Sequence, residues 1–216
     1  MSELFNAYDA YLIGRKSGIG NYLFFGDSPG GSNEKLALSC IRYAIEYLLR
    51  WSREMAIKKF DRVTIERLKL GKMVSYIDYP IYVLPGDPKF ILSKLYPDRI
   101  FIQPEECVEE IYKRILEDGI QFPREFFTGE DGFKRFAICL SYLIRNYKVF
   151  HSLEDIYQFF SSPEGNQFLS LYRLRSPSFQ LGINPIDVVY ELTKEEEDSR
   201  LYYCYYLFLS KKDNLF

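Results

Sequence analysis

The apolar residues of this sequence recur mostly at helical spacing, and this periodicity constrains the fold more than any other feature. Residues 33–53 carry a broad apolar stripe made of Leu36, Cys40, Ala44, Leu48 and Trp51 and widened by Leu38, Ile41 and Ile45. Residues three and four apart share one face of a helix, so this spacing predicts a long central helix.

Capping signals mark further helices along the chain. They are Asp87-Pro88, Pro104, Ser152 with Asp155, Asn184-Pro185, and Thr193 with Glu196. Strand candidates are few: a hairpin of "AYLI" (10–13) and "NYLFF" (21–25) around a Gly-rich loop, and the segments 76–84 and 99–103. The predicted fold class is mostly α-helical, with a small β-hairpin element near the N-terminus.

Length and composition suit one large or two small globular domains. The chain has 216 residues, of which 47% are hydrophobic, and its net charge is −2. We predict an N-terminal hairpin or arm at 1–33 and two helical subdomains at 34–118 and 119–216. A slightly acidic chain has no global positive field that would draw it onto nucleic acid.

Targeting signals are weak, and the longest aromatic and apolar run, residues 201–209, is too short to cross a bilayer. The first residues lack the apolar core of a signal peptide. Four cysteines make no disulfide framework, because that is far too few for a chain of this length. We therefore predict a cytoplasmic protein without a membrane partner.

Residues for catalysis and metal binding are sparse. Cys40, Cys107, Cys139 and Cys204 fall in separate predicted helices without a CxxC pair, and His151 is the single histidine. We predict buried structural cysteines, no metal site, no cofactor and no catalytic residues, so the chain is predicted not to be an enzyme.

The Gly-rich stretch "GDSPGGSNEKLAL" (26–38) is the part of the sequence that most resembles a nucleotide-binding loop. Gly26 and Gly31 have the spacing of a P-loop, but Ser32-Asn33 replaces the required Lys-Ser/Thr pair, and Lys35 comes too late. We predict a turn followed by a helix N-cap at Ser32 or Asn33, and no bound nucleotide.

A weak internal repeat relates residues 52–73 to residues 152–174. Both segments begin with a serine cap, and Phe60 and Phe160 each follow eight residues later. Each copy predicts two short helices joined by a turn, which is the outline of a helix-turn-helix unit.

The first copy lies in a basic segment, in which eight basic residues between positions 50 and 72 oppose three acidic ones. We predict DNA binding by Arg50, Arg53, Lys58, Lys59, Arg62, Arg67, Lys69 and Lys72, with Asn166, Gln167 and Arg173 in the second copy. A charged solvent-facing or partner-facing surface is the alternative interpretation.

A second functional hypothesis is protein interaction or self-association. The C-terminal segment carries tyrosines around a whole predicted helix, namely Tyr202, Tyr203, Tyr205 and Tyr206. A helix that is apolar all round is either buried or bound to a partner, and tyrosine is favoured at interfaces.

Three segments, "FPREFFTGEDGFKRFAICLSYLIRNY", "SLEDIYQFFSSPEGNQFLSLYRLRSP" and "NPIDVVYEL", resemble a family of uncharacterised bacterial proteins. The resemblance extends over roughly residues 50–208. It implies a helical bacterial protein and brings no activity, cofactor or catalytic residue. DNA binding or regulation through helix-turn-helix-like units remains the first functional hypothesis, protein interaction is the second, and an enzyme of unknown type is the third.

Overall fold

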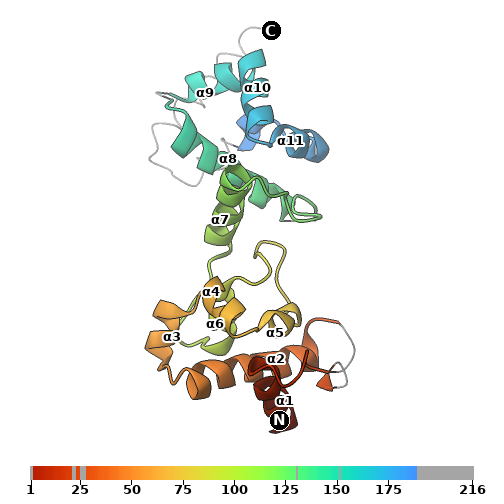
Figure 1. Cartoon of the computed structure of the whole chain (residues 1–216). Coiled ribbons are helices and arrows are strands. Elements are labelled where there is room, and N and C mark those ends of the chain that lie inside the picture. The colour runs from red at the N-terminus through yellow and green to blue at the C-terminus, as the bar shows by residue number, and fades with distance from the viewer. Residues whose placement is uncertain (1, 21–22, 25–27, 130, 151, 189–216) are drawn as a thin grey trace. The chain divides into compact units, whose positions relative to one another are not determined.

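The computed structural model describes residues 2–20, 23–24, 28–129, 131–150 and 152–188, and these residues are mostly helical (Figure 1). No strand occurs among them. The chain divides into two compact units, Met1–Cys107 and Val108–Phe216, so the division falls within one helix. Within the described ranges, no helix is long and apolar enough to cross a membrane.

The N-terminal unit contains seven helical elements in its described part. They are α1 (Ser2–Leu12), α2 (Gly31–Tyr43), the π-helical continuation η2 (Ala44–Leu48), α3 (Arg53–Lys59), α4 (Arg62–Arg67), α5 (Gly71–Ser75) and α6 (Pro88–Leu95).

The C-terminal unit holds most of α7 (Pro104–Glu117), followed by α8 (Gly132–Tyr147), α9 (Leu153–Phe160), α10 (Pro163–Leu171) and α11 (Arg175–Leu181). A further helical turn begins at Pro185 and continues to the last described residue.

Side-chain caps set the starts of the short helices. The side chains of Ser52, Asp61, Asp87, Ser152 and Ser162 each accept a hydrogen bond from the backbone N–H three residues later. Each bond satisfies one of the N–H groups that the first turn of a helix leaves unpaired. The starts predicted from Ser52, Asp87 and Ser152 are confirmed.

The predicted N-terminal hairpin is wrong in its first strand, because α1 covers positions 10–12. Leu4, Ala7 and Tyr8 are buried, and their spacing of three and four residues gives α1 a helical apolar face that the sequence analysis missed. Most of the predicted second strand, at 21–25, lies outside the described residues.

The predicted strands at 76–84 and 99–103 are also wrong, because both segments are turns and loops. Val83 donates to Pro80 O at 2.9 Å and Asp87 to Leu84 O at 3.0 Å, so local turns satisfy the backbone here. Ile77 and Val83 are still buried in the core, which explains the apolar pattern without a sheet.

The start of α2 also differs from the prediction, because Gly30 rather than Ser32 or Asn33 occupies the N-cap. Asn33 is buried inside the first turn, and its side-chain amide donates to Ser28 O at 3.0 Å. Gly30 has a φ of 86°, in the left-handed region that favours glycine, and its N–H donates to Tyr76 O at 2.9 Å. That N–H is therefore not available to a phosphate.

The two units repeat the same helix order and the same tyrosine hydrogen bond. In the N-terminal unit, the Tyr8 hydroxyl on α1 donates to Leu68 O at the end of α4, at 2.7 Å. In the C-terminal unit, the Tyr112 hydroxyl on α7 donates to Tyr172 O at the end of α10, at 2.8 Å. Both bonds span 60 residues of chain, and both rings are completely buried.

The helix ends beside these tyrosines are also equivalent. Lys69 and Arg173 have left-handed φ values of 52° and 61°. The next residue in each unit, Leu70 or Leu174, donates to the carbonyl five positions back, at 2.9 and 2.8 Å. This pattern is a Schellman motif, and each buried leucine is also the N-cap of the following helix, α5 or α11.

The cores of the two units continue the correspondence. Cys40 on α2 lies near Tyr8, and Cys139 on α8 lies near Tyr112, and both cysteines are completely buried. The equivalence therefore extends from α1, α2, α4 and α5 to α7, α8, α10 and α11. The repeat seen in the sequence as two short helix pairs is part of a larger structural repeat.

Candidate functional site

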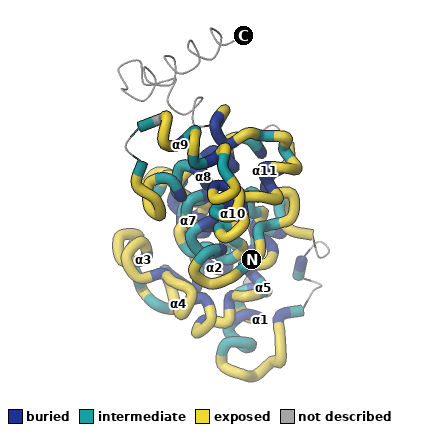
Figure 2. The backbone as a smooth tube through the Cα atoms, turned by 90° about the horizontal axis from the view of Figure 1, so that it is seen from above, coloured by how far each residue is buried: buried dark blue, intermediate teal, exposed yellow. Residues whose placement is uncertain are grey.

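Five of the eight basic residues predicted between positions 50 and 72 form what we call the α3–α4 cationic surface. They are Arg50, Lys58, Lys59, Arg62 and Arg67, and all five are exposed. Across the described residues, none of these side chains makes a hydrogen bond or an ion pair. Helices α3 and α4 are largely exposed in Figure 2, so these cations face solvent.

Three predicted DNA-binding residues instead make contacts within their own unit. Arg53 lies 3.9 Å from the Asp98 carboxylate and 5.7 Å from the centre of the Tyr96 ring. The Lys69 ammonium donates to the backbone O of Tyr11 and Leu12, at 3.4 and 3.3 Å, at the C-terminal end of α1. Because α-helices end with unpaired carbonyl groups, this lysine stabilises that end.

Lys72 is also engaged with the connection between α1 and α2. Its ammonium donates to Ile19 O and lies 5.5 Å from the centre of the Phe24 ring. Phe24 in turn stacks on Tyr76, with ring centroids 4.2 Å apart. Lys72 therefore helps to hold this connection against α5.

Three acidic side chains lie among the cations of α3 and α4. Hydrogen bonds from the side chain and the backbone N–H of Thr64 lower the pKa of Asp61. Hydrogen bonds from the backbone N–H of Glu54 itself and from the Ser52 side chain lower the pKa of Glu54. Both carboxylates are thus charged at neutral pH, and a third acidic side chain, that of Glu66, is exposed on α4. The positive charge of this surface is smaller than the sequence segment indicates.

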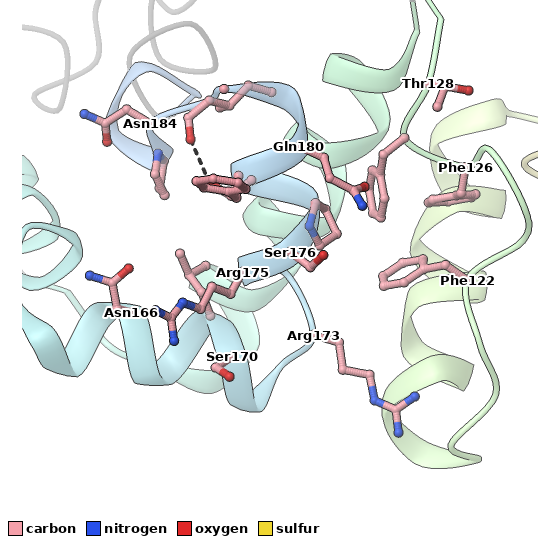
Figure 3. A pocket seen from close by; sticks show the side chains of 18 of the residues that line it. Phe122, Phe126, Thr128, Asn166, Ser170, Arg173, Arg175, Ser176, Gln180 and Asn184 are labelled. Carbon is pink, nitrogen blue, oxygen red and sulfur yellow. Dashed lines mark hydrogen bonds between the residues drawn. The ribbon is translucent and has the colours of Figure 1, made fainter.

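The predicted contact residues of the second copy separate into two groups. Asn166 and Arg173 line a groove of about 1300 Å³ in the C-terminal unit, whereas the exposed Gln167 lies outside its lining. We call this the α10–α11 groove. It is bounded by the α7–α8 connection, α10, α11 and residues 182–185 (Figure 3).

Aromatic rings form one wall of the α10–α11 groove. Phe126 and Phe127 are buried and meet edge to face, with centroids 4.9 Å apart, and Phe127 packs in the same way on Phe122. Figure 3 shows Phe122 and Phe126 on the connection, opposite Ser176 and Gln180 of α11. Phe126 and Phe127 are buried and Phe122 is partly exposed, so little of the ring surface of this wall is open.

The buried Arg135 fixes the connection that carries these rings. Its guanidinium donates to Phe126 O at 2.5 Å and to Thr128 O at 2.7 Å. Gly132 lies close to the same segment, because a Cβ at this position would lie 2.5 Å from Phe127 O. The aromatic wall is therefore held by backbone contacts as well as by packing.

Polar groups line the remainder of the groove. Arg173, Arg175 and Glu125 are its charged lining residues, and the others include the amides of Asn166 and Gln180 and the hydroxyl of Ser176. Arg173 donates one hydrogen bond to Ile120 O at 3.1 Å. The Glu125 carboxylate lies 3.6 Å from the guanidinium of Arg124, which is not a lining residue. Because two arginines oppose one glutamate in the lining, the net charge of the groove is positive.

The thiols of the described residues are poorly suited to nucleophilic chemistry. Burial raises the pKa of Cys40 to about 12 and also raises that of Cys139, so both are protonated at neutral pH. Within the described ranges, no group of three His, Cys, Asp or Glu side chains could hold a metal ion.

The single histidine, His151, and the Tyr-rich segment with Tyr202, Tyr203, Tyr205 and Tyr206 lie outside the described residues. Protein interaction or self-association through these tyrosines stays a prediction. The aromatic wall of the groove was not predicted from the sequence, although the density of phenylalanine in "QFPREFF" (121–127) was an available signal.

Residues 108–192 match the model of a family described as "Protein of unknown function (DUF4046)". The predicted resemblance to an uncharacterised family is thereby confirmed over this range. No curated protein and no solved structure shows a significant match. The matched range contains every lining residue of the α10–α11 groove.

Proposed function

We propose that this chain is a non-enzymatic DNA-binding or regulatory protein, in which the pairs α3–α4 and α9–α10 act as helix-turn-helix-like units. One observation carries the proposal: the five residues of the α3–α4 cationic surface are exposed and make no ion pair or hydrogen bond with any described residue. Cations that the fold does not use are available to phosphate groups.

The geometry favours contacts to phosphates over the recognition of base sequence. Helix α4 has six residues and is thus about 9 Å long, whereas a recognition helix must extend into a major groove about 12 Å wide. Its exposed residues include Glu66 beside Arg67, and a carboxylate there would oppose phosphate. We therefore expect weak sequence preference and strong dependence on salt.

We also infer a bacterial protein of the cytoplasm. The inferred bacterial origin rests on the resemblance given above. The inferred compartment rests on Cys40, Cys107 and Cys139, which are free thiols, as expected where thiols are kept reduced.

The test is fluorescence anisotropy with a labelled DNA duplex at several salt concentrations. We expect the fourfold variant Lys58→Ala, Lys59→Ala, Arg62→Ala and Arg67→Ala to bind much more weakly than the wild type. Its plot of log affinity against log salt should flatten by about 3 to 4 units, because each lost phosphate contact removes about 0.9.

A matched variant controls for net charge. Lys89, Arg99, Arg124 and Lys134 are cations in exposed ion pairs elsewhere, and their fourfold alanine variant loses the same charge. This variant should bind DNA more tightly than the α3–α4 variant. Equal loss in both variants, or no binding by the wild type at low salt, would refute the proposal.

A further inference from the structure

We propose that the α10–α11 groove binds an acidic peptide segment that inserts an apolar side chain against the aromatic wall. The groove has a volume of about 1300 Å³, which is more than most small ligands fill and is enough for several residues of an extended peptide. This site is in the C-terminal unit and is independent of the DNA surface proposed above.

In the N-terminal unit, side chains fill the region that is equivalent to this groove. Counting from the equivalent leucines Leu70 and Leu174, Lys72 corresponds to Ser176, and Tyr76 corresponds to Gln180. In the N-terminal unit, Lys72 reaches the backbone O of Ile19, and Tyr76 stacks on a phenylalanine of the α1–α2 connection. That unit's own side chains therefore occupy the space between the connection and α5.

At the same positions of the C-terminal unit, the smaller Ser176 and the polar Gln180 are exposed and line the groove. In Figure 3 they lie opposite Phe122 and Phe126 of the α7–α8 connection. The shorter side chains at these two positions leave a space beside the partly exposed ring of Phe122 that no described side chain fills. An external side chain can take the place that Lys72 and Tyr76 take in the N-terminal unit.

The charge of the lining selects an acidic partner. The Arg175 guanidinium makes no ion pair or hydrogen bond within the described part of the chain, and Arg173 uses only one nitrogen for Ile120 O. Arginine guanidinium groups form paired hydrogen bonds with carboxylates. The amides of Asn166 and Gln180 provide donors and acceptors for a peptide backbone.

The aromatic geometry favours a peptide over single-stranded nucleic acid. Binding of unpaired bases relies on exposed ring faces on which successive bases stack. Here Phe126, Phe127 and Phe160 are buried, and among the phenylalanines of the lining Phe179, at 88% exposure, offers an open face. Two arginines opposed by one glutamate would also neutralise few phosphates.

The experiment selects peptides from a random dodecapeptide library displayed on phage, using the full-length chain as bait. We expect the enriched sequences to combine aspartate or glutamate with a large apolar residue. The best sequence is then synthesised with a fluorescent label and titrated by anisotropy. Arg175→Glu should weaken its binding at least tenfold, and Phe179→Ala should weaken it by a smaller factor.

The double variant Ser176→Lys, Gln180→Tyr gives a sharper test, because it installs in the groove the side chains of the N-terminal unit. Both positions are exposed, so the fold should persist, as circular dichroism can verify, while peptide binding should be lost. Lys134→Ala, which removes an exposed cation outside the groove, should bind as the wild type does.

Several results would overturn this proposal. They are a selection that enriches no sequence or only basic sequences, equal peptide binding by wild type and double variant, and a groove that binds oligo(dT) in place of peptide. Concentration-dependent dimerisation that the double variant abolishes would show that a second copy, not a peptide, occupies the groove. The duplex-DNA assay with the α3–α4 variant is unaffected by any of these outcomes.

Discussion

The two units of this chain share a skeleton of hydrogen bonds but differ in how they use the space around it. Tyr8 and Tyr112 bind equivalent carbonyls, and Leu70 and Leu174 close equivalent helix ends. The side chains around the next helix then diverge, because Lys72 contacts the α1–α2 connection while Ser176 lines an open groove. The comparison shows that both units retain the hydrogen bonds that close these helix ends. The side chains that lie next to them differ between the units.

The largest effect is expected where the C-terminal unit has no space at all. Gly165 is the third residue of α10, and a methyl group there would overlap the backbone O of Phe159. The equivalent position of the N-terminal unit is Thr64, the third residue of α4, and it carries a larger side chain. Gly165→Ala should reduce the free energy of unfolding by about 3 kcal/mol, because a backbone atom cannot move aside cheaply.

Urea unfolding followed by circular dichroism measures this change. Gln167→Ala, at an exposed position of the same helix, is the control and should change stability by less than about 0.5 kcal/mol. If Gly165→Ala were as stable as the control, α10 would not pack against the end of α9 as described.

The shared tyrosine bond predicts paired effects in the two units. Tyr8→Phe and Tyr112→Phe each remove a buried hydroxyl and leave a backbone carbonyl without its donor. Each should destabilise the protein by about 1 to 2 kcal/mol. Hydrogen exchange should locate the loss in the N-terminal unit for Tyr8→Phe and in the C-terminal unit for Tyr112→Phe.

Tyr11→Phe is a control on α1, because the hydroxyl of Tyr11 makes no hydrogen bond in the described part of the chain. A loss confined to Tyr8→Phe or Tyr112→Phe alone would show that the two bonds are not equivalent.

The buried thiols predict the same alkaline behaviour in both units. Burial raises the pKa of Cys40 to about 12 and raises that of Cys139, while an unfolded thiol ionises near about 8.5. The native state therefore binds more protons above that pH, and stability falls as pH rises, for Cys40 up to about pH 12. Below about pH 8 this contribution is fully present.

Cys40→Ala and Cys139→Ala should each flatten the fall of the unfolding free energy above pH 8.5, by up to about 1.4 kcal/mol per pH unit. Urea titrations at several alkaline pH values measure these slopes. Ser170→Ala, which removes no group that titrates there, should leave the slope unchanged. Parallel slopes in all variants would contradict the burial of the thiols.

The smallest effect is expected at the two left-handed residues. Lys69→Gly and Arg173→Gly relieve a φ that disfavours residues with a side chain, but glycine loses more conformational freedom on folding. Lys69→Gly also removes the hydrogen bonds to the end of α1, and Arg173→Gly removes the one to Ile120 O in the α7–α8 connection. The net change should stay within about 0.5 kcal/mol in either unit. Valine at either position should cost about 1 kcal/mol or more, because a branched side chain tolerates this φ poorly.

Helix content was predictable from the sequence because local signals determine it. The caps at Ser52, Asp87 and Ser152 and the apolar spacing around Cys40 and Ile41 lie within a few residues of the helices they mark. The hairpin prediction failed because "AYLI" was considered alone, whereas Leu4 and Tyr8 show the helical period only over the whole of α1.

The candidate sites were less predictable because they depend on contacts distant in sequence. A count of charges between positions 50 and 72 cannot show that Lys69 pairs with carbonyls of α1, 57 and 58 residues away. Nor can it show that "QFPREFF" faces α11 across a groove. The repeat was visible at Phe60 and Phe160, but its full extent required the hydrogen bonds of Tyr8 and Tyr112.

The π-helical turn η2 suggests how one of these units tolerated a change of length. Leu49 donates to Ala44 O, five residues back, at 3.0 Å, so this turn holds one residue more than an α-helical turn. A single insertion in a regular helix would rotate every later residue by about 100° and expose the apolar face. Here the wide turn absorbs the extra residue locally, with Ala44 and Ile45 still buried and Tyr47 left 73% exposed. Because η2 ends at Leu48 and α3 begins at Arg53, the extra residue is confined to the last turn of this helix, and the buried face of α2 with Ala37, Cys40 and Ile41 keeps its register.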